Sequence, residues 1–321
     1  MIRYLVHRLL QSAAVLLLMS FVIYGLMGLM PGDPVDLMIT ADPKMTSEDA
    51  ARLRQLYGLD RPLIERYGNW LLAALAGDFG YSRLYAKPVL TVLLPALANT
   101  VVLLGSSFVL AIAIGLPAGM LAAVRPRTAT DYAINLVAFA GISVPSFWLG
   151  LLLIIVFAVI LGVLPAGGMG TVEAVSLWGN LKYLVLPVVS LTIASMGGYI
   201  RYMRASMLET LRQDFIRTAW AKGLSQRRVV LGHGLPNALI PVVTIIALDF
   251  GSLFSGALIT ETIFAYPGMG KLIFDSIMGN DFNLALVALL FATLLTLVGN
   301  LLADIAYAWL DPRISFAREE R

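Results

Sequence analysis

The stretch DFIRTAWAKGLSQRRVVLGHGLP, residues 214–236, is a basic, hydrophilic segment between two long apolar runs. It predicts a short helix from Asp214 to Lys222, with Asp214 as its cap, followed by a sharp turn at Gly223. A second short helix is expected from Ser225 to about Leu231. Pro236 then opens the next apolar run, at a position where its missing N–H costs little. A plain connection between two membrane helices needs no such order, so a structured loop outside the membrane is predicted.

Long uncharged runs on both sides of this loop indicate the class of protein. The chain of 321 residues is 59% hydrophobic and only 13% charged, whereas soluble domains carry about 25% charged residues. A helix needs about 20 apolar residues to cross the hydrocarbon core. Six runs approach or exceed that length, and the third is expected to end its span near Leu161: Leu9–Met30, Asn99–Val124, Tyr132–Val172, Tyr183–Ile200, Leu235–Thr260 and Asn283–Ala303. The sequence therefore predicts an all-α membrane protein with six transmembrane helices.

The distribution of basic residues indicates how these spans are oriented. Lys and Arg gather before the first run, after the second, between the fourth and fifth, and after the sixth. The short loops on the other side hold only Lys182 and Lys271. Because Lys and Arg accumulate in cytoplasmic loops, we expect both termini and the 214–236 loop in the cytoplasm. The net charge of +3 then reflects topology and does not indicate nucleic-acid binding.

The topology divides the chain into four parts. Residues 1–30 form a cytoplasmic amino terminus and the first span, and residues 31–95 form an extracytoplasmic helical insertion between spans 1 and 2. Within the insertion, Thr46 to Asp49 offer caps and acids for a helix through about Leu56. A further helix is expected from Pro62 to about Ala76, against the membrane surface or a partner. Residues 96–310 form the remaining five spans with a cytoplasmic loop at 201–236, and residues 311–321 form a cytoplasmic tail.

The residues give no support to an enzyme. The chain has no cysteine and two histidines, and it shows no hydrolase or metalloprotease motif and no clustered carboxylates. The stretch Gly268-Met269-Gly270-Lys271 is not a phosphate loop, because Ala265 and Leu272 stand where a glycine and a Ser or Thr are required. We therefore expect no catalytic residue, no metal site and no ATP bound to this chain.

Small residues and prolines lie inside the expected spans. Gly115 and Gly119 have the GxxxG spacing that permits close helix packing. Pro145 and Pro187 are expected to interrupt the third and fourth spans. Broken helices often surround a translocation path, because the freed carbonyl groups must face protein or water. We assign Pro145 and Ser146 to a candidate path on this ground.

Asp249 is the one clear acid inside an expected span. It follows Leu235 by 14 residues, which places it roughly 20 Å into the fifth span at 1.5 Å per residue. An acid in hydrocarbon costs about 2.5–3.5 kcal/mol, so it should face protein or a water-filled path. Asp249 is therefore a candidate for the translocation path, where it would favour a cationic group. A packing role for a protonated or hydrogen-bonded side chain stays open.

The loop at 214–236 resembles the EAA loop of ABC importer permeases. The family spacing is kept as Gly223, nine residues, His233, one residue and Leu235-Pro236, with Arg217-Thr218-Ala219 in place of Glu-Ala-Ala. The Arg-Thr-Ala variant is similar to the dipeptide/oligopeptide/nickel branch. Further segments resemble family patterns in the same order along about 310 residues: Arg3–Leu5, 31–34, 57–62, Gly77–Ser82, Ser143–Trp148, Leu164–Gly168, Glu261–Phe264, Tyr266–Gly270 and 311–313.

The resemblance implies the type I importer permease fold in a bacterial cytoplasmic (inner) membrane. It implies a homologous second permease, two ATPase subunits that carry ATP and Mg, and an extracytoplasmic substrate-binding protein. The loop would dock on an ATPase through ten residues: Asp214, Phe215, Arg217, Thr218, Ala219, Trp220, Lys222, Gly223, Leu235 and Pro236. An aromatic anchor with a charged rim suits a protein interface, although a basic amphipathic helix on membrane lipid has a similar composition.

The resemblance also limits the substrate. Di- and oligopeptides are the expected class in this branch, and nickel complexes, glutathione or other small solutes remain alternatives. The rival from another class is an ion-coupled secondary carrier, which should show inverted repeats and several intramembrane ionisable residues. One clear acid and no visible repeat do not favour that rival.

Overall fold

A computed structural model describes residues 2–29, 46–56, 60–169, 177–252 and 257–310. By its internal contacts the chain forms two compact units, Met1–Ala98 with Gly268–Leu295, and Asn99–Pro267 with Thr296–Arg321. Four features of the sequence lie wholly or partly outside the described residues. These are the motifs at 31–34, 57–62 and 311–313, and the carboxyl-terminal tail.

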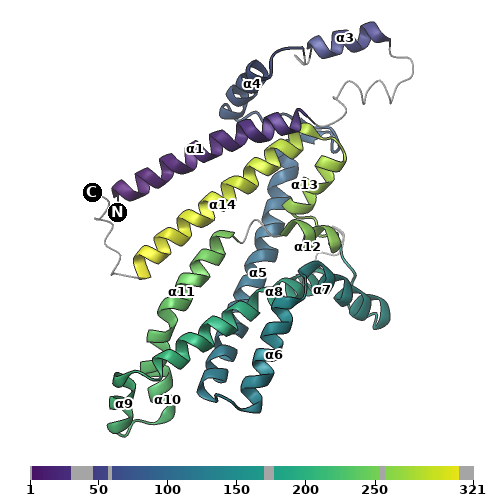
Figure 1. The fold of residues 1–321 in the computed structure, drawn as a ribbon. Helices are drawn as coiled ribbons and strands as arrows, with labels where there is room; N and C mark the ends of the chain where they lie inside the picture. Colours follow the sequence, from purple (N-terminus) through teal and green to yellow (C-terminus); the bar gives the residue numbers. More distant parts are fainter. Residues whose placement is uncertain (1, 30–45, 57–59, 170–176, 253–256, 311–321) are drawn as a thin grey trace. The chain divides into compact units, whose positions relative to one another are not determined.

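Long apolar helices make up most of the described chain (Figure 1). The unbroken ones are α1 (Ile2–Met27), α5 (Val89–Val124), α8 (Leu177–Thr210), the segment ending in α11 (Leu235–Ser252), and α14 (Phe282–Leu310). Each contains a stretch long and apolar enough to cross a membrane. A bent pair, α6 (Ala129–Ser143) and α7 (Ser146–Leu153), makes a sixth span if it is counted as one. The predicted helical membrane protein with six spans is thus confirmed.

Pro145 breaks the third span, as predicted. The helix axis turns by 104° between the α6 and α7 halves. Val144 is extended (φ −88°, ψ 123°), because a residue before proline is driven out of the helical region. A π-helix, η1 (Ile154–Ile160), continues α7. The predicted interruption at Pro187 is wrong: α8 runs unbroken through it, since one proline removes a single hydrogen bond and the helix is packed against α6, α7 and α11.

Glycines permit close contacts of α8 with its neighbours. A Cβ added to Gly119 on α5 would lie 2.5 Å from the carbonyl oxygen of Ile200 on α8. One added to Gly197 on α8 would lie 2.4 Å from the carbonyl oxygen of Ala138 on α6. Gly115, one turn before Gly119, faces α8 in the same way. The packing role predicted from the GxxxG spacing is therefore present, and α8 is the helix on which α5 and α6 converge.

The loop at 214–236 contains α9 (Asp214–Ala221), α10 (Gln226–Arg228) and a π-helix, η2 (Val229–Gly234). Gly223 has φ +77°, which confirms the predicted sharp turn. The predicted end of the second short helix near Leu231 is wrong, because α10, η2 and α11 continue as one helical segment from Gln226 to Phe250. Local π adjustment is a known way to accommodate proline within a membrane helix, and η2 ends at Gly234, two residues before Pro236.

The first unit holds the two helices predicted in the insertion, α3 (Ser47–Leu56) and α4 (Leu63–Leu75). A reciprocal pair of backbone and side-chain hydrogen bonds between Thr46 and Asp49 caps α3. A short antiparallel pair, β1 (Tyr81–Ser82) and β2 (Lys87–Pro88), was not expected in an all-α chain. The hairpin is held to the start of α14 by Asp281, which accepts hydrogen bonds from the Ser82 hydroxyl and the Leu84 N–H. Two further helices, α12 (Ala257–Ile263) and α13 (Met269–Met278), precede α14.

Candidate functional site

The inner edge of α9 anchors it to the end of the α8–α11 pair (Figure 1). Ile216 and Ala219 are only 1% and 5% exposed. They form a small apolar core with Val229 of η2, bordered by Leu211 and Leu224. Leu211 directly follows α8, and Val229 belongs to the segment that leads into α11. Helix α9 is therefore packed against residues joined to both long helices.

Two aromatic side chains of α9 are left exposed. Phe215 and Trp220 are 43% and 47% exposed. At about 100° per residue they lie on either side of the buried edge formed by Ile216 and Ala219. The four apolar residues of α9 therefore divide into a buried pair, Ile216 and Ala219, and an exposed pair, Phe215 and Trp220. Exposed aromatic side chains beside charged residues suit a partner surface.

The polar residues of α9 form its outer face. Asp214 is the first helical residue and not the cap: Gln213 stands at that position and makes no side-chain capping bond. The predicted capping role of Asp214 is therefore wrong, although its charge still suits the positive end of the helix dipole. It pairs with Arg217 at 3.1 Å, and its carbonyl oxygen accepts the Thr218 hydroxyl.

The remaining predicted residues of this loop fall into two places. Lys222 ends α9, and the N–H of Gly223 bonds to the carbonyl oxygen of Trp220. The left-handed Gly223 thus reverses the chain directly after the aromatic pair. Leu235 and Pro236 begin α11, beyond η2. They belong to the long helix and not to the turn.

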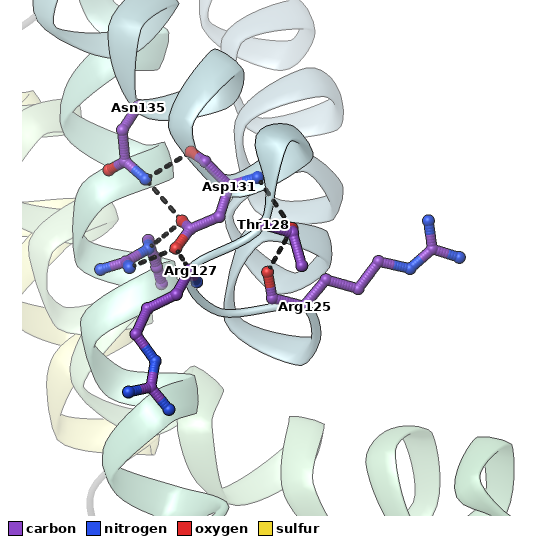
Figure 2. Close-up of polar contacts among 6 residues, drawn as sticks. Arg125, Arg127, Thr128, Asp131 and Asn135 are labelled. Carbon is purple, nitrogen blue, oxygen red and sulfur yellow. Dashed lines mark hydrogen bonds and ion pairs between the residues drawn. The ribbon is translucent and has the colours of Figure 1, made fainter.

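A buried ion pair that sequence reasoning missed joins α6 to α8. The carboxylate of Asp131, 2% exposed, accepts Nε and Nη2 of Arg204 at 2.6 and 2.8 Å. It also accepts the Arg127 backbone N–H at 2.9 Å and the Asn135 amide at 2.7 Å. Figure 2 shows the loop that carries Arg127 and Thr128 folded around Asp131. A fork-like pair of this kind fixes two helices more firmly than a single contact.

The bonds around Asp131 fix the turn between α5 and α6 as well. Thr128 caps α6, because its hydroxyl oxygen accepts the Asp131 N–H, and its hydroxyl donates to the carbonyl oxygen of Arg125 (Figure 2). Arg127 has φ +61°, a conformation that costs a non-glycine residue free energy. Thr128 before an acid is a local capping signal. Arg204 is 73 residues away, so the sequence holds no signal for the pair.

Asp249 is exposed on the surface of the chain although it lies inside an apolar span. Its carboxylate is hydrogen-bonded to the hydroxyl of Tyr199 on α8. Tyr199 is 2% exposed and its ring meets that of Phe108, which in turn meets Phe250. Tyr199 is a second residue that sequence reasoning missed, because one tyrosine in a helix of apolar residues carries no distinguishing pattern.

Pro145 and Ser146 lie at the break of the third span, away from Asp249. The Ser190 hydroxyl of α8 donates to the carbonyl oxygen of Ser146 at 3.2 Å. Ser190 precedes Tyr199 by nine residues, about 14 Å along α8 at 1.5 Å per residue. Ser146 and Asp249 are therefore bonded to residues of α8 that lie about 14 Å apart along that helix. The structure does not bring the three candidate path residues together.

Two segments that resemble family patterns meet beside the buried Glu261. The N–H of Gly168 donates to the carbonyl oxygen of Phe264 at 2.8 Å. Glu261 is fully buried and accepts the Thr100 hydroxyl at 2.5 Å. Burial, and secondly the charge of Glu261, raise the pKa of Tyr266 to about 12. The Tyr266 hydroxyl donates to the carbonyl oxygen of Asn99 at 3.3 Å.

The fold and this arrangement define a helical membrane protein of several spans, with a short helix, α9, at the end of the packed α8–α11 pair. Comparison with known families gives the same result. Residues 115–316 match the binding-protein-dependent transport system inner membrane component, and residues 1–104 match the amino-terminal component of the same kind of protein. The chain belongs to this family, and it is a multi-pass permease subunit of an ABC importer, a transport component and not an enzyme.

Individual relatives cover the whole chain. It is 40% identical over 318 residues to the oligopeptide transport system permease protein AppB of Bacillus subtilis, covering 98% of this chain and 100% of AppB. It is 36% identical over 316 residues to the glutathione transport system permease protein GsiC of Escherichia coli, covering 98% and 100%. An inward-facing structure of the MetNI methionine ABC transporter shares the fold, with a TM-score of 0.56 and 19% identity over 68% of this chain and 95% of that one.

Proposed function

We propose that this chain forms half of the translocation pathway of an ATP-driven peptide importer and receives the force of ATP binding through α9. The family places it with a partner permease, ATPase subunits and a binding protein. Our proposal adds one homologous permease, two ATPases and a cytoplasmic location for α9 and both termini. The observation that carries it is the division of α9 into an inward pair, Ile216 and Ala219, and an exposed pair, Phe215 and Trp220.

The packing of α8 supports a mechanical role for α9. The buried residues of α9 contact Leu211, which follows α8, and Val229, in the segment before α11. Helices α8 and α11 are also joined directly, because the Ser206 hydroxyl donates to the carbonyl oxygen of Ala238 at 2.7 Å. Close-packed interiors deform little and pass displacements on. When ATP closes the two ATPases, α9 would move with them and tilt α8 and α11 together. The pore would then exchange an inward opening for an outward one, with ATP supplying the differential affinity for the two states.

The test of docking is a double substitution, Phe215→Ala with Trp220→Ala, in the complete importer. Both side chains are exposed, so membrane insertion should persist. We expect ATPase subunits to co-purify in reduced amount, and peptide uptake and binding-protein-stimulated ATP hydrolysis to fall together. Gln226→Ala, an exposed change outside α9, is the matched control. Normal uptake and stimulation in the double variant would contradict the proposal.

The orientation has its own test, because the chain contains no cysteine. Ser225→Cys, in the loop, and Ser47→Cys, in the insertion, each introduce one reactive thiol. An impermeant maleimide added to intact spheroplasts should label the second and spare the first until the membrane is opened. The opposite pattern would reverse the proposed topology.

Peptides are the proposed substrate class, because the relatives named above are permeases for oligopeptides and for glutathione. Nickel complexes and other small solutes stay as alternatives of the same family. Within the pathway we assign Asp249 to the passage of cationic groups such as a peptide amino terminus. Its support is a carboxylate exposed on the chain surface inside a span, where hydrocarbon would cost about 2.5–3.5 kcal/mol.

Asp249→Asn removes the charge and keeps the volume and a hydrogen-bond acceptor for Tyr199. We expect uptake of peptides with a free amino terminus to fall more than uptake of their acetylated counterparts that the binding protein still accepts. Tyr199→Phe is the control for the hydrogen bond alone, and it should affect both substrates equally. Equal losses for both substrates in Asp249→Asn, with the importer assembled, would refute a role for the charge.

A further inference from the structure

Helix α4 has three strips along its length, and among the described residues one of them packs against other helices. Tyr67 is buried and Trp70 half-buried against α1 and the start of α14. The next strip around the helix is also apolar and the third is polar; at about 100° per residue Leu72 lies at their border, about 20° from Glu65. The second strip is exposed: Ile64 66%, Leu72 69% and Leu75 77%. The polar strip carries Glu65 and Asn69, both exposed.

The contacts of Tyr67 show that α4 packs beside α1 at a point before the end of the first span. Its hydroxyl is hydrogen-bonded to the Ser20 hydroxyl at 2.7 Å in a buried position. Ser20 lies seven residues before Met27, where the span Val6–Met27 ends. At 1.5 Å per residue that is about 10 Å inside the end of the span. A helix lying in a membrane interface buries its apolar face to a depth of about 5–10 Å.

The aromatic residues at this level support the same depth. The ring of Tyr24 on α1 meets the rings of Tyr67 and Phe282 at 5.6 Å each, and that of Trp70 at 5.9 Å. Phe282 is the first residue of the span Phe282–Ile305. The cluster therefore joins the end of one span to the start of another. Tyr and Trp are enriched at the boundary between hydrocarbon and water.

We propose that α4 is an interfacial helix whose exposed strip of Ile64, Leu72 and Leu75 is occupied by lipid acyl chains of the leaflet at the Met27 end of α1. Lipid is favoured over a protein partner because α4 is packed on a span that is itself open: only 17% of its apolar window is buried within the chain. Leu18 and Leu26 of that span are 62% and 61% exposed. The polar strip with Glu65 and Asn69 then faces water, beside the headgroups.

An interfacial α4 would give the importer a support that is separate from α9 and the translocation pathway. Lipid on one strip and the aromatic cluster on the other hold α4 in the membrane plane. The first span is thereby tied to the membrane boundary at its Met27 end. The insertion then serves as a fixed support in the membrane and not as a mobile arm in water.

Three single cysteines test the depth: Leu72→Cys and Leu75→Cys on the exposed strip, and Asn69→Cys on the polar strip as the matched control. Each is spin-labelled in the complete importer in lipid nanodiscs, and collision rates with oxygen, which partitions into lipid, and with a water-soluble nickel chelate are compared. We expect oxygen to collide several-fold more often than the chelate at positions 72 and 75, and the reverse at 69. Retained ATP hydrolysis shows that each labelled importer is assembled.

Three outcomes would overturn the proposal. Frequent chelate collisions at positions 72 and 75 would place the strip in water. Protection from both reagents in the importer alone would mean that another permease surface covers it. If oxygen collisions are lost only when the purified binding protein is added, that protein, and not lipid, covers the strip during transport.

Discussion

Two aspartate–arginine pairs distinguish the packed helices α6 and α8 from the short helix α9. Asp131 and Arg204 join α6 to α8 with exposures of 2% and 27%. Asp214 and Arg217 lie one turn apart on α9 with exposures of 93% and 76%. The first pair has two direct bonds and further donors on the same carboxylate, whereas the second has one contact in water. The same residue types therefore hold two elements together in one region and form part of an outer surface in the other.

The difference separates a region held by buried contacts between helices from a short helix with an exposed outer surface. Half of the apolar window of α8 is buried, and backbone meets backbone at its glycine contacts. In α9 only one edge is buried. An exposed ion pair adds little to stability because water and salt screen it. We therefore expect substitutions in the first region to alter folding, and substitutions in the second to alter transport with the fold retained.

The largest effect should follow from Asp131→Ala. Removing one partner of a buried pair leaves a charge without compensation and costs about 3–5 kcal/mol. Thermal unfolding of the purified importer should shift strongly downward. The double variant with Arg204→Met should recover part of the loss, because it removes the stranded charge. Asp214→Ala is the control in the other region, and it should leave the unfolding temperature unchanged. An equal shift in unfolding temperature for Asp131→Ala and Asp214→Ala would contradict the difference in stability between the two ion pairs.

A second, smaller effect is expected at a glycine of α8. Gly197→Ala would place a methyl group 2.4 Å from the Ala138 carbonyl oxygen, and overpacking of this kind costs about 1–3 kcal/mol. The neighbouring Gly198 has no atom within 4 Å of an added Cβ, so Gly198→Ala is the matched control and should be neutral. Importer yield and unfolding temperature measure both. A neutral Gly197→Ala would show that α6 and α8 can separate without loss.

The smallest effect on stability should come from the turn after α9. Gly223 has φ +77° and open space around its Cβ position, so Gly223→Val adds backbone strain without a clash. A left-handed residue costs about 1–2 kcal/mol, which the exposed turn relieves by shifting α9. Peptide uptake should fall while the unfolding temperature changes little. Gly223→Asn tolerates the left-handed conformation and should keep more uptake. Full uptake in Gly223→Val would mean that the position of α9 is unimportant.

Several parts of the molecule could be predicted because their signals are local. Apolar run length predicted the spans, Gly223 predicted the turn, and Pro145 predicted the break, since each depends on neighbouring residues or on one backbone preference. Errors arose where packing decides. The helix after Gly223 continues into the fifth span through η2, and Asp214 is not a cap because the helix begins at Asp214 itself, one residue earlier than that role requires. Pro187 leaves its helix intact because neighbouring helices support it.

The sequence by itself determined the class of protein, the number of its spans and the position of the structured loop at 214–236, because these follow from contiguous stretches and their order. Only the tertiary structure decided which edge of α9 is buried, that Tyr199 is bonded to Asp249, and that Asp131 meets Arg204. Those pairs are formed by residues far apart in the chain, and each residue has many chemically suitable partners along the sequence. The contact that forms is selected by how the helices pack, at glycines such as Gly119 and Gly197 where two backbones come within contact distance.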